Sequence, residues 1–374
     1  MKQLIYADNA ATTQLDIDAF EAMKPYLLGE YGNASQPYSF ARTAKKALKN
    51  SREIIAQCIG AQPEEIFFTS GGTESNNWAI KGIAFSDPVK HAFITSVIEH
   101  HAILRPCADI ERMGHPVSYL PVDYTGTVNI ETLAENINSD TRLVSVMTAN
   151  NEIGSIQDIS ALAAIAHSCG AIFHTDAVQA VGHIEIDVNS LGVDMLSASA
   201  HKFNGPKGIG FLYVRIGTPL MPYASGGGQE HNMRAGTENV ASIVGMATAL
   251  KKNVAAMKDT ASHLALLENR LLVGFSNANI RFLRNGSGMH IPGILSLSFP
   301  GYSGEALLHR LDLMGICVST GSACNSQKTQ ISHVLQAIGL NPELAKGTIR
   351  LSFGRNNSES DVDKIVESLQ QILG

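Results

Sequence analysis

Short apolar runs rich in β-branched and aromatic residues alternate with longer amphipathic stretches along the first half of the chain. The apolar runs predict β-strands, which we place at 65–69, 91–96, 142–148, 171–176 and 194–199. Helical patterns such as 159–169 lie between them. This alternation is typical of an α/β fold whose mostly parallel sheet is covered by helices. Ligands of such sheets bind beyond the carboxyl ends of the strands.

The last third of the chain has a different pattern. A long helical stretch covers about 240–275, and the segments after it are shorter. Among these we expect two strands and two helices, at 294–299, 348–353, 304–313 and 358–373, respectively. This α+β arrangement predicts a second, smaller domain. We therefore expect a large domain over 12–258 and a small domain that combines 1–11 with 259–374.

Composition narrows the functional classes. The 374 residues carry a formal charge of −6 without a basic block, so nucleic acid is not an expected partner. The chain shows no secretory signal and no membrane-spanning apolar run, and we expect a cytoplasmic protein without a membrane partner. The five cysteines are scattered, which does not suit a disulfide framework, and no CxxC or HExxH motif predicts a metal site. At least one thiol is a candidate for reactivity.

A lysine and an acid follow two of the predicted strands. Lys202 lies in SAHKFNGPKG at 199–208, and Asp176 lies in HTDAVQ at 174–179. Taken alone, the lysine would be a surface residue and the aspartate a helix cap. A pyridoxal enzyme, however, needs a lysine that holds the cofactor and an acid opposite the pyridine nitrogen, because a protonated ring is the better electron sink. Neighbouring strand ends would supply both.

A glycine turn completes the pattern. TSGGTESN at 69–76 follows a strand and opens a helix, so free backbone amides, hydroxyl groups and the positive helix end converge on one point. Alone, this turn could equally be a plain tight turn. In company with the lysine and the acid it predicts a phosphate site, which we expect at the cleft between the two domains.

Together with YADNAATT at 6–13 and TIRLSFGR at 348–355, these motifs resemble those of the cysteine desulfurases, a family of pyridoxal-phosphate enzymes in the class V aminotransferase group. The resemblance covers nearly the whole chain. It implies the aspartate aminotransferase-like fold, PLP fold type I, with the cofactor in the large domain and the catalytic-cysteine loop in the small one. It also implies an obligate homodimer.

The resemblance further implies roles for individual residues. Lys202 would hold pyridoxal phosphate, Asp176 would pair with its ring nitrogen and Gln179 would contact its phenolic oxygen. His100 would stack on the ring and could shuttle a proton, although histidines at helix starts are usually only polar residues there; its neighbour His101 is less suited. Phosphate contacts would come from Gly72, Thr73, Ser199, His201 and, reaching in from the partner subunit, Thr237.

Three residues would serve the substrate. The guanidinium of Arg350 suits a bidentate bond to the substrate's carboxylate, assisted by Asn151 beside the cofactor, whereas outside this family an arginine near a chain end is usually a surface charge. Cys324, in STGSACNS at 319–326, lies among small and polar residues and resembles the family's sulfur-accepting cysteine. Its SGSAC sequence is that of the iron–sulfur cluster assembly branch, where this cysteine rides on a long flexible loop and could transiently ligate a cluster.

The implied reaction removes sulfur from L-cysteine, leaving L-alanine and a persulfide on Cys324 that passes to an acceptor protein, a cluster scaffold or another carrier. The sequence departs from the family pattern at Tyr38, where histidine is usual, and at Asn325, where threonine is common. It ends at Gly374 without the tail that docks the scaffold in many members, which puts delivery to a scaffold in question. The alternatives are a selenocysteine lyase, another class V reaction such as transamination, or a non-catalytic docking protein.

Overall fold

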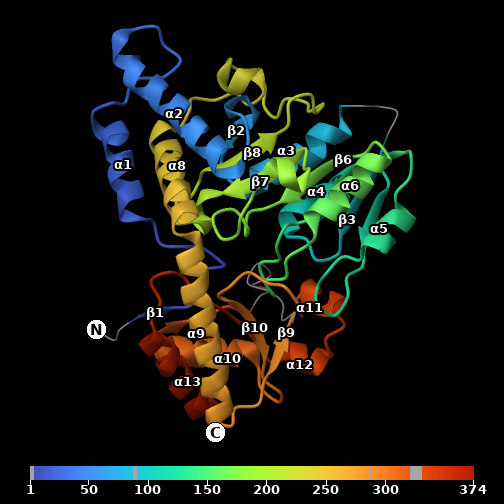
Figure 1. Ribbon diagram of the computed structural model, residues 1–374, viewed down its shortest axis with the longest axis vertical. Coiled ribbons are helices and arrows are strands. Elements are labelled where there is room, and N and C mark those ends of the chain that lie inside the picture. Colours follow the sequence, from blue (N-terminus) through green and yellow to red (C-terminus); the bar gives the residue numbers. More distant parts are fainter. Residues whose placement is uncertain (1–3, 87–90, 287, 321–330) are drawn as a thin grey trace.

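The computed structural model describes residues 4–86, 91–286, 288–320 and 331–374 (Figure 1). A seven-stranded sheet in the order β2-β8-β7-β6-β5-β3-β4 forms the centre of its larger part. Neighbouring strands are parallel, except that β8 runs antiparallel to both β2 and β7. The strands are β2 (Ile66–Thr69), β3 (Ala92–Ser96), β4 (Val117–Leu120), β5 (Thr141–Ser145), β6 (Ile172–Asp176), β7 (Met195–Ser199) and β8 (Gly210–Val214).

Helices cover both faces of this sheet because its strands alternate apolar side chains between two buried surfaces. On one face Phe67 and Leu212 pack with α3 and α4; on the other Phe68 and Phe211 pack with α2, α6 and α8. The helices of this part are α1 (Ile17–Leu28), α2 (Arg42–Ile59), α3 (Gly72–Ala84), α4 (His101–Arg112), α5 (Ile130–Asn136), α6 (Ile159–Ser168), α7 (Val188–Leu191) and α8 (Val240–Ala255). Short 3-10 helices form at Ser39–Ala41, Pro63–Glu65, Ala200–Lys202 and Gln229–Asn232.

The remaining elements surround a separate hydrophobic core, which joins Ile5 and Ala7 to buried residues between Leu264 and Ile372. We call this part the C-terminal unit. Its antiparallel sheet has the order β12-β10-β9, and β1 pairs in parallel with β11. The strands are β1 (Ile5–Tyr6), β9 (Leu283–Asn285), β10 (Ile294–Ser298), β11 (Ile316–Cys317) and β12 (Thr348–Ser352). The helices are α9 (Met257–Asn277), α10 (Gly304–Leu313), α11 (His333–Ala337), α12 (Pro342–Lys346) and α13 (Glu359–Leu373).

The predicted elements all occur, with two differences in extent. The helical stretch expected over 240–275 is two helices, since α8 ends at Ala255 and α9 starts at Met257. The strand expected to reach residue 148 ends at Ser145. Strands β1, β4, β8, β9 and β11 were missed, although the apolar run of β8, bounded by glycine, carried a usable signal. In the part of the chain that the structure describes, no helix is both long and apolar enough to cross a bilayer.

The burial of His174 predicts that the free energy of unfolding falls in acid. The side chain is fully buried in β6, where its ring nitrogens are hydrogen-bonded to Ser145 Oγ at 2.8 Å and Ser197 Oγ at 3.0 Å. Burial lowers the pKa of His174 to about 3. An unfolded histidine has a pKa of about 6.5, so below that pH the unfolded chain gains a proton that the folded chain excludes, which costs about 2 kcal/mol by pH 5.

Denaturant unfolding at pH 7 and pH 5 should therefore show a smaller pH-dependent loss of free energy for His174→Gln than for the wild-type protein. The relevant quantity is the difference between the two pH values within each protein, because the substitution also changes stability at pH 7. Equal losses in both proteins would contradict this account of His174.

Candidate active site

A cavity of about 560 Å³ opens where β2, β6 and β7 end. Side chains of the C-terminal unit close it from the other side, through Ser319 and Arg350. The structure brings most of the predicted site residues together around this cavity: Gly72, Thr73, His100, Asn151, Asp176, Gln179, Ser199, His201, Lys202 and Arg350.

Two predicted residues are not among the described residues that line this cavity. Thr237 is exposed on the loop that precedes α8 and does not line the cavity of its own chain. Cys324 lies outside the described residues. The roles assigned to these two residues therefore stay predictions.

The turn after β2 forms a cradle for an anion. Gly71 caps α3 with φ +146°, a backbone conformation that favours glycine. A Cβ on Gly72 would lie 2.5 Å from Val178 Cγ2, so only glycine fits there. Gly72 and Thr73, the first residues of this 13-residue helix, line the cavity together with Ser199, and the first amides of a helix have no partner within it. Backbone N–H groups and the helix dipole together suit a phosphate group.

Asp176 has a hydrogen-bond partner that the sequence did not reveal. Its Oδ2 accepts from Asn76 Nδ2 at 2.6 Å and its Oδ1 from the backbone N–H of Val178 at 3.0 Å. Asn76 lies one turn into α3, at the end of the motif that predicted the phosphate site. Asn76 Oδ1 and Gln179 Oε1 are buried without a hydrogen-bond partner in the described structure. Unpaired buried polar atoms on a cavity wall fit a polar ligand that would satisfy them.

Lys202 ends the short helix after β7 and extends toward the N-terminal segment. Its Nζ donates to the carbonyl of Ala10, and its own carbonyl accepts from His183 Nε2 at 2.9 Å. Both contacts fix the lysine at the cavity wall. Asp176, at the end of the neighbouring strand β6, lines the same cavity.

Two histidines of the cavity are held neutral. His100 caps α4, with Nδ1 accepting from the N–H of Ala102 at 3.1 Å. Burial lowers the pKa of His100, and the charge on Lys202 adds to the effect while Asp176 opposes it. Burial, reinforced by Lys202 and Lys207, lowers the pKa of His201 to about 4. Neutral imidazoles do not repel the lysine, and because Nδ1 of His100 accepts a hydrogen bond, its Nε2 carries the single ring proton.

Arg350 is buried on β12 with part of its guanidinium already paired. Nη2 donates to Asp8 Oδ1 at 2.6 Å and Nη1 to the carbonyl of Asn151 at 2.8 Å. Its Nε is buried without a partner in the described structure. The arginine is therefore oriented by Asp8, which sequence reasoning missed, and keeps N–H donors for a carboxylate.

The sequence pattern of the aminotransferase class-V family matches residues 5–365. The chain is 46% identical over 376 residues to a protein named cysteine desulfurase IscS from Dictyoglomus turgidum, covering all of this chain and 95% of that one. The chain belongs to the cysteine desulfurases. Among solved structures, a NifS-like protein is 37% identical with a TM-score of 0.93, each chain being 99% covered. The structure titled SspA in complex with cysteine is 36% identical with a TM-score of 0.84, covering 96% of this chain and all of that one.

Membership in this family makes the protein a pyridoxal-phosphate enzyme with fold type I, and the cavity fits that cofactor. The α3 cradle suits the phosphate, Lys202 is the amine at the wall, and the unpaired atoms of Asn76 and Gln179 suit a polar ring. Within residues 4–86, 91–286, 288–320 and 331–374, no group of His, Cys, Asp and Glu side chains is arranged to hold a metal ion.

In this desulfurase, residues on both sides of the 321–330 segment contact residues that line the cavity or stand next to such residues in the sequence. On the N-terminal side, the backbones of Ser319 and Arg350 exchange two hydrogen bonds. On the C-terminal side, Ser332 Oγ donates to Glu152 Oε2 at 2.5 Å and His333 Nε2 donates to the carbonyl of Glu99 at 3.0 Å. Burial raises the pKa of Glu152 to about 7, against the hydrogen bond from Ser332 and the charge on Arg350. None of these contacts is visible as a local sequence pattern.

Replacing Asn76 by alanine should weaken cofactor binding, because it removes the amide that donates to Asp176. A hydrogen bond to a charged group contributes about 1.5–3 kcal/mol, so we expect at least a tenfold rise in the dissociation constant of pyridoxal phosphate. Titration of the apoenzyme, followed by protein fluorescence, measures this constant. Asn77→Ala is the matched control, since Asn77 Nδ2 bonds only to the backbone of Thr73 on the exposed side of α3. Equal effects of the two substitutions would contradict the assigned role of Asn76.

Proposed function

We propose that this enzyme removes sulfur from L-cysteine, releasing L-alanine and leaving a persulfide on Cys324. The observation that carries the proposal is the shared cavity of Lys202, Asp176 and Arg350, in a chain of the cysteine desulfurase family. An amine, a carboxylate and a guanidinium that line one cavity suit a cofactor that reacts with an amino acid. L-Cysteine as substrate is further supported by the related SspA structure, whose title names bound cysteine.

Arg350 and Asn151 bind and orient the amino acid in this proposal. The carboxylate meets the unpaired Nε–H of Arg350, while Asp8 and the Asn151 carbonyl keep the guanidinium plane fixed. Fixing this plane in advance lowers the entropic cost of binding and aligns the substrate's α-carbon with the amine of Lys202.

The chemistry that bound pyridoxal phosphate supplies is an electron sink for the charge that develops on the substrate. Asp176, kept in place by Asn76, would stabilise the protonated ring nitrogen, and Gln179 would bond the phenolic oxygen. Gly72, Thr73, Ser199 and His201 would hold the phosphate, the last as a neutral donor. The amine of Lys202 would then take the α-proton of the substrate, and His100 would stack on the ring and carry a proton.

Sulfur transfer would join two sulfur atoms. The thiolate of Cys324 attacks the substrate's sulfur, the new S–S bond forms, and the bond between that sulfur and Cβ breaks. The electron pair left on Cβ takes up a proton, which yields alanine, and the transferred sulfur keeps its hydrogen as a persulfide. Cysteine and one enzyme thiol thus become alanine and one persulfide, without any external oxidant or reductant.

The persulfide sulfur would pass to an acceptor protein in iron–sulfur cluster or thio-cofactor synthesis, in keeping with the SGSAC sequence. We place this activity in the cytoplasm, where thiols stay reduced. In support, Cys58, Cys107 and Cys317, which belong to the described part of the chain, are free thiols.

We further propose that the active form is a homodimer in which Thr237 completes the partner's phosphate site. Apolar side chains on α1 and the segment after it are exposed in the single chain: Ile17 is 65%, Leu28 75% and Tyr31 72% exposed. Large exposed apolar patches mark interaction surfaces. Thr237 lies on an exposed loop away from its own cavity, as a residue that serves another subunit must.

Cys324→Ser tests the sulfur step. We expect the variant to bind cofactor and to change its absorbance when L-cysteine is added, but to form no persulfide and almost no alanine, because a serine hydroxyl stays protonated near neutral pH. Persulfide labelling and alanine release measure the outcome. Lys202→Ala should instead abolish the absorbance change.

Buried Cys107 and partly buried Cys58 provide controls for that experiment. Burial raises the pKa of Cys107 to about 12 and that of Cys58 to about 11, so both remain protonated thiols. Their serine variants should keep sulfur transfer. Sustained turnover of Cys324→Ser without added thiols would contradict direct attack by Cys324 and would favour a selenocysteine lyase.

A mixed dimer tests Thr237. We expect Thr237→Ala alone to weaken cofactor binding roughly tenfold or more, the loss of one hydrogen bond to a charged group. In a dimer of one Lys202→Ala subunit and one Thr237→Ala subunit, one site would carry both defects and the other neither. Half of the sites should then bind cofactor with wild-type affinity. If no site regains that affinity, or if a monomer binds cofactor fully, Thr237 does not act across the interface.

A further inference from the structure

The segment 8–16, which we call the N-terminal strap, contacts residues on opposite walls of the cavity. Near its start, Asp8 Oδ1 accepts from Arg350 Nη2 at 2.6 Å. Two residues further on, the carbonyl of Ala10 accepts from Lys202 Nζ. The strap therefore joins the residue that would bind the substrate's carboxylate to the residue that would take its α-proton.

The second half of the strap holds the turn that carries the lysine. The N–H and Oγ1 of Thr13 both donate to the carbonyl of His201, at 2.9 and 2.8 Å. Asn204 donates from its N–H to Thr13 Oγ1 at 2.8 Å and from Nδ2 to the carbonyl of Gln14 at 2.9 Å. The N–H of Asp16 returns a bond to the carbonyl of Asn204 at 2.9 Å. With hydrogen bonds on both sides of Lys202, the turn must follow any movement of the strap.

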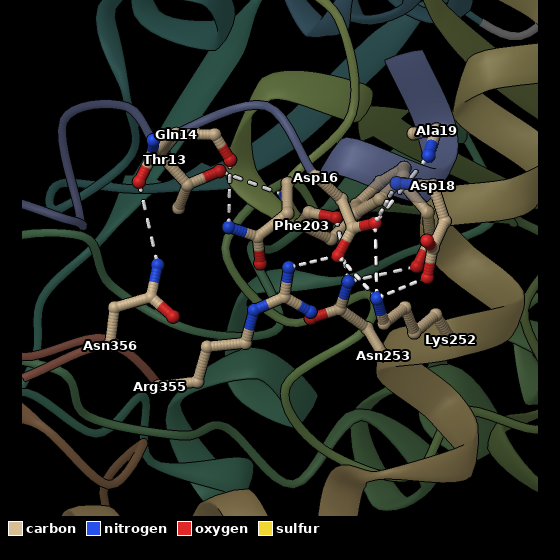
Figure 2. Close-up of polar contacts among 12 residues, drawn as sticks. Thr13, Gln14, Asp16, Asp18, Ala19, Phe203, Lys252, Asn253, Arg355 and Asn356 are labelled. Atoms are coloured by element: carbon tan, nitrogen blue, oxygen red, sulfur yellow. Dashed lines mark hydrogen bonds and ion pairs between the residues drawn. The ribbon is translucent and has the colours of Figure 1, made fainter. Parts of the chain in front are cut away.

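The strap ends at a buried carboxylate with two cationic partners (Figure 2). The Asp16 side chain is only 2% exposed and caps α1 by accepting from the N–H of Asp18 at 2.8 Å. Its Oδ2 also accepts from Lys252 Nζ at 3.0 Å and from Arg355 Nη2. Burial alone would raise the pKa of Asp16, but the hydrogen bonds from Lys252, the Asp18 N–H and Arg355 outweigh it and hold this pKa below its usual value. A helix cap needs no charge, since asparagine or serine serves equally well.

The two cations come from different parts of the molecule. Lys252 lies on α8, which packs against α1, so its ion pair stays within the part that contains the large sheet. Arg355 follows β12 in the C-terminal unit, five residues after Arg350. Figure 2 shows Arg355 reaching across to Asp16, with Asn356 directed at Gln14 beside it. Arg355 is therefore the cation that connects the strap to the strand that bears Arg350.

We propose that Asp16 and Arg355 are a positioning pair for the substrate, fixing Arg350 at the distance from Lys202 that one amino acid requires. Neither residue lines the cavity, so the pair acts through the strap and β12. Arg350 would be held twice, by Asp8 on its guanidinium and by Arg355 on the backbone that follows it. The inference rests on the proposed function in one respect, that the substrate's carboxylate binds Arg350.

Arg355→Gln and Lys252→Gln are compared because each removes one cation from Asp16; Lys252 also pairs with Asp18 at 2.5 Å. We expect Arg355→Gln to raise the KM for L-cysteine and the dissociation constant of L-alanine by about tenfold, with kcat and cofactor affinity within about twofold of wild type. Lys252→Gln should leave both binding constants unchanged. L-Alanine binding is read from the visible absorbance of the bound cofactor, independently of turnover.

Further variants separate positioning from stability. Arg355→Lys keeps the charge and should restore most of the L-alanine affinity. Asp16→Asn keeps the cap and should match Arg355→Gln, and the double variant should be no worse than either single one, because both break the same pair. If Arg355→Gln does not fold, the KM and the L-alanine affinity of Asp16→Asn are compared with those of Lys252→Gln, which tests the same pair.

Two results would overturn the proposal. Wild-type KM and L-alanine affinity in Arg355→Gln, with only a lowered melting temperature, would make the pair purely structural. If Lys252→Gln raised the KM as much as Arg355→Gln does, the cause would be the loss of any cation beside Asp16 and not the link to Arg355. L-Alanine binding does not use the thiol of Cys324, so failure of the sulfur-transfer proposal leaves this test intact. Failure of the wild-type enzyme to bind L-alanine would instead contradict the proposed function.

Discussion

The direction of three strands determines where the chemistry of this enzyme can take place. β8 runs antiparallel to both β2 and β7, so β2 and β7 point the same way, and β6 is parallel to β7. Their carboxyl ends therefore meet at one edge, where the phosphate cradle, Asp176 and Lys202 follow directly. The three groups are far apart in sequence, and the sheet alone brings them to one cavity.

Burial determines which groups of this cavity carry charge. It lowers the pKa of His100 and His201 in the cavity and raises that of Glu99, the residue before His100, to about 8, moving each group toward its neutral form. Asp176 and Arg350 each have a hydrogen-bond partner of their own, Asn76 and Asp8 respectively. The carboxyl group and the guanidinium that the proposed reaction needs are therefore both held by hydrogen bonds within the site.

The sequence predicted the cavity better than its supporting contacts. Lys202, Asp176 and the α3 cradle were found because each follows an apolar strand, and strand ends can be read locally. Asn76 and Asp8 were missed because their partners lie 100 and 342 residues away, and no local pattern records such a contact. The break at Ala256 was missed because neither glycine nor proline marks it. The domain boundaries and the roles of the individual site residues, including Thr237 and Cys324, stay predictions.

The pairing of β1 with β11 has a consequence for biosynthesis. Ile5 is made long before its partner Ile316, and Asp8 long before Ser352, with which it forms a bridge. A growing chain can complete the large sheet while its first strand still lacks a partner. The N-terminal strap can reach its final place only when β12 has left the ribosome. A polypeptide released too early would therefore contain the lysine but no organised substrate site, and it could not consume cysteine.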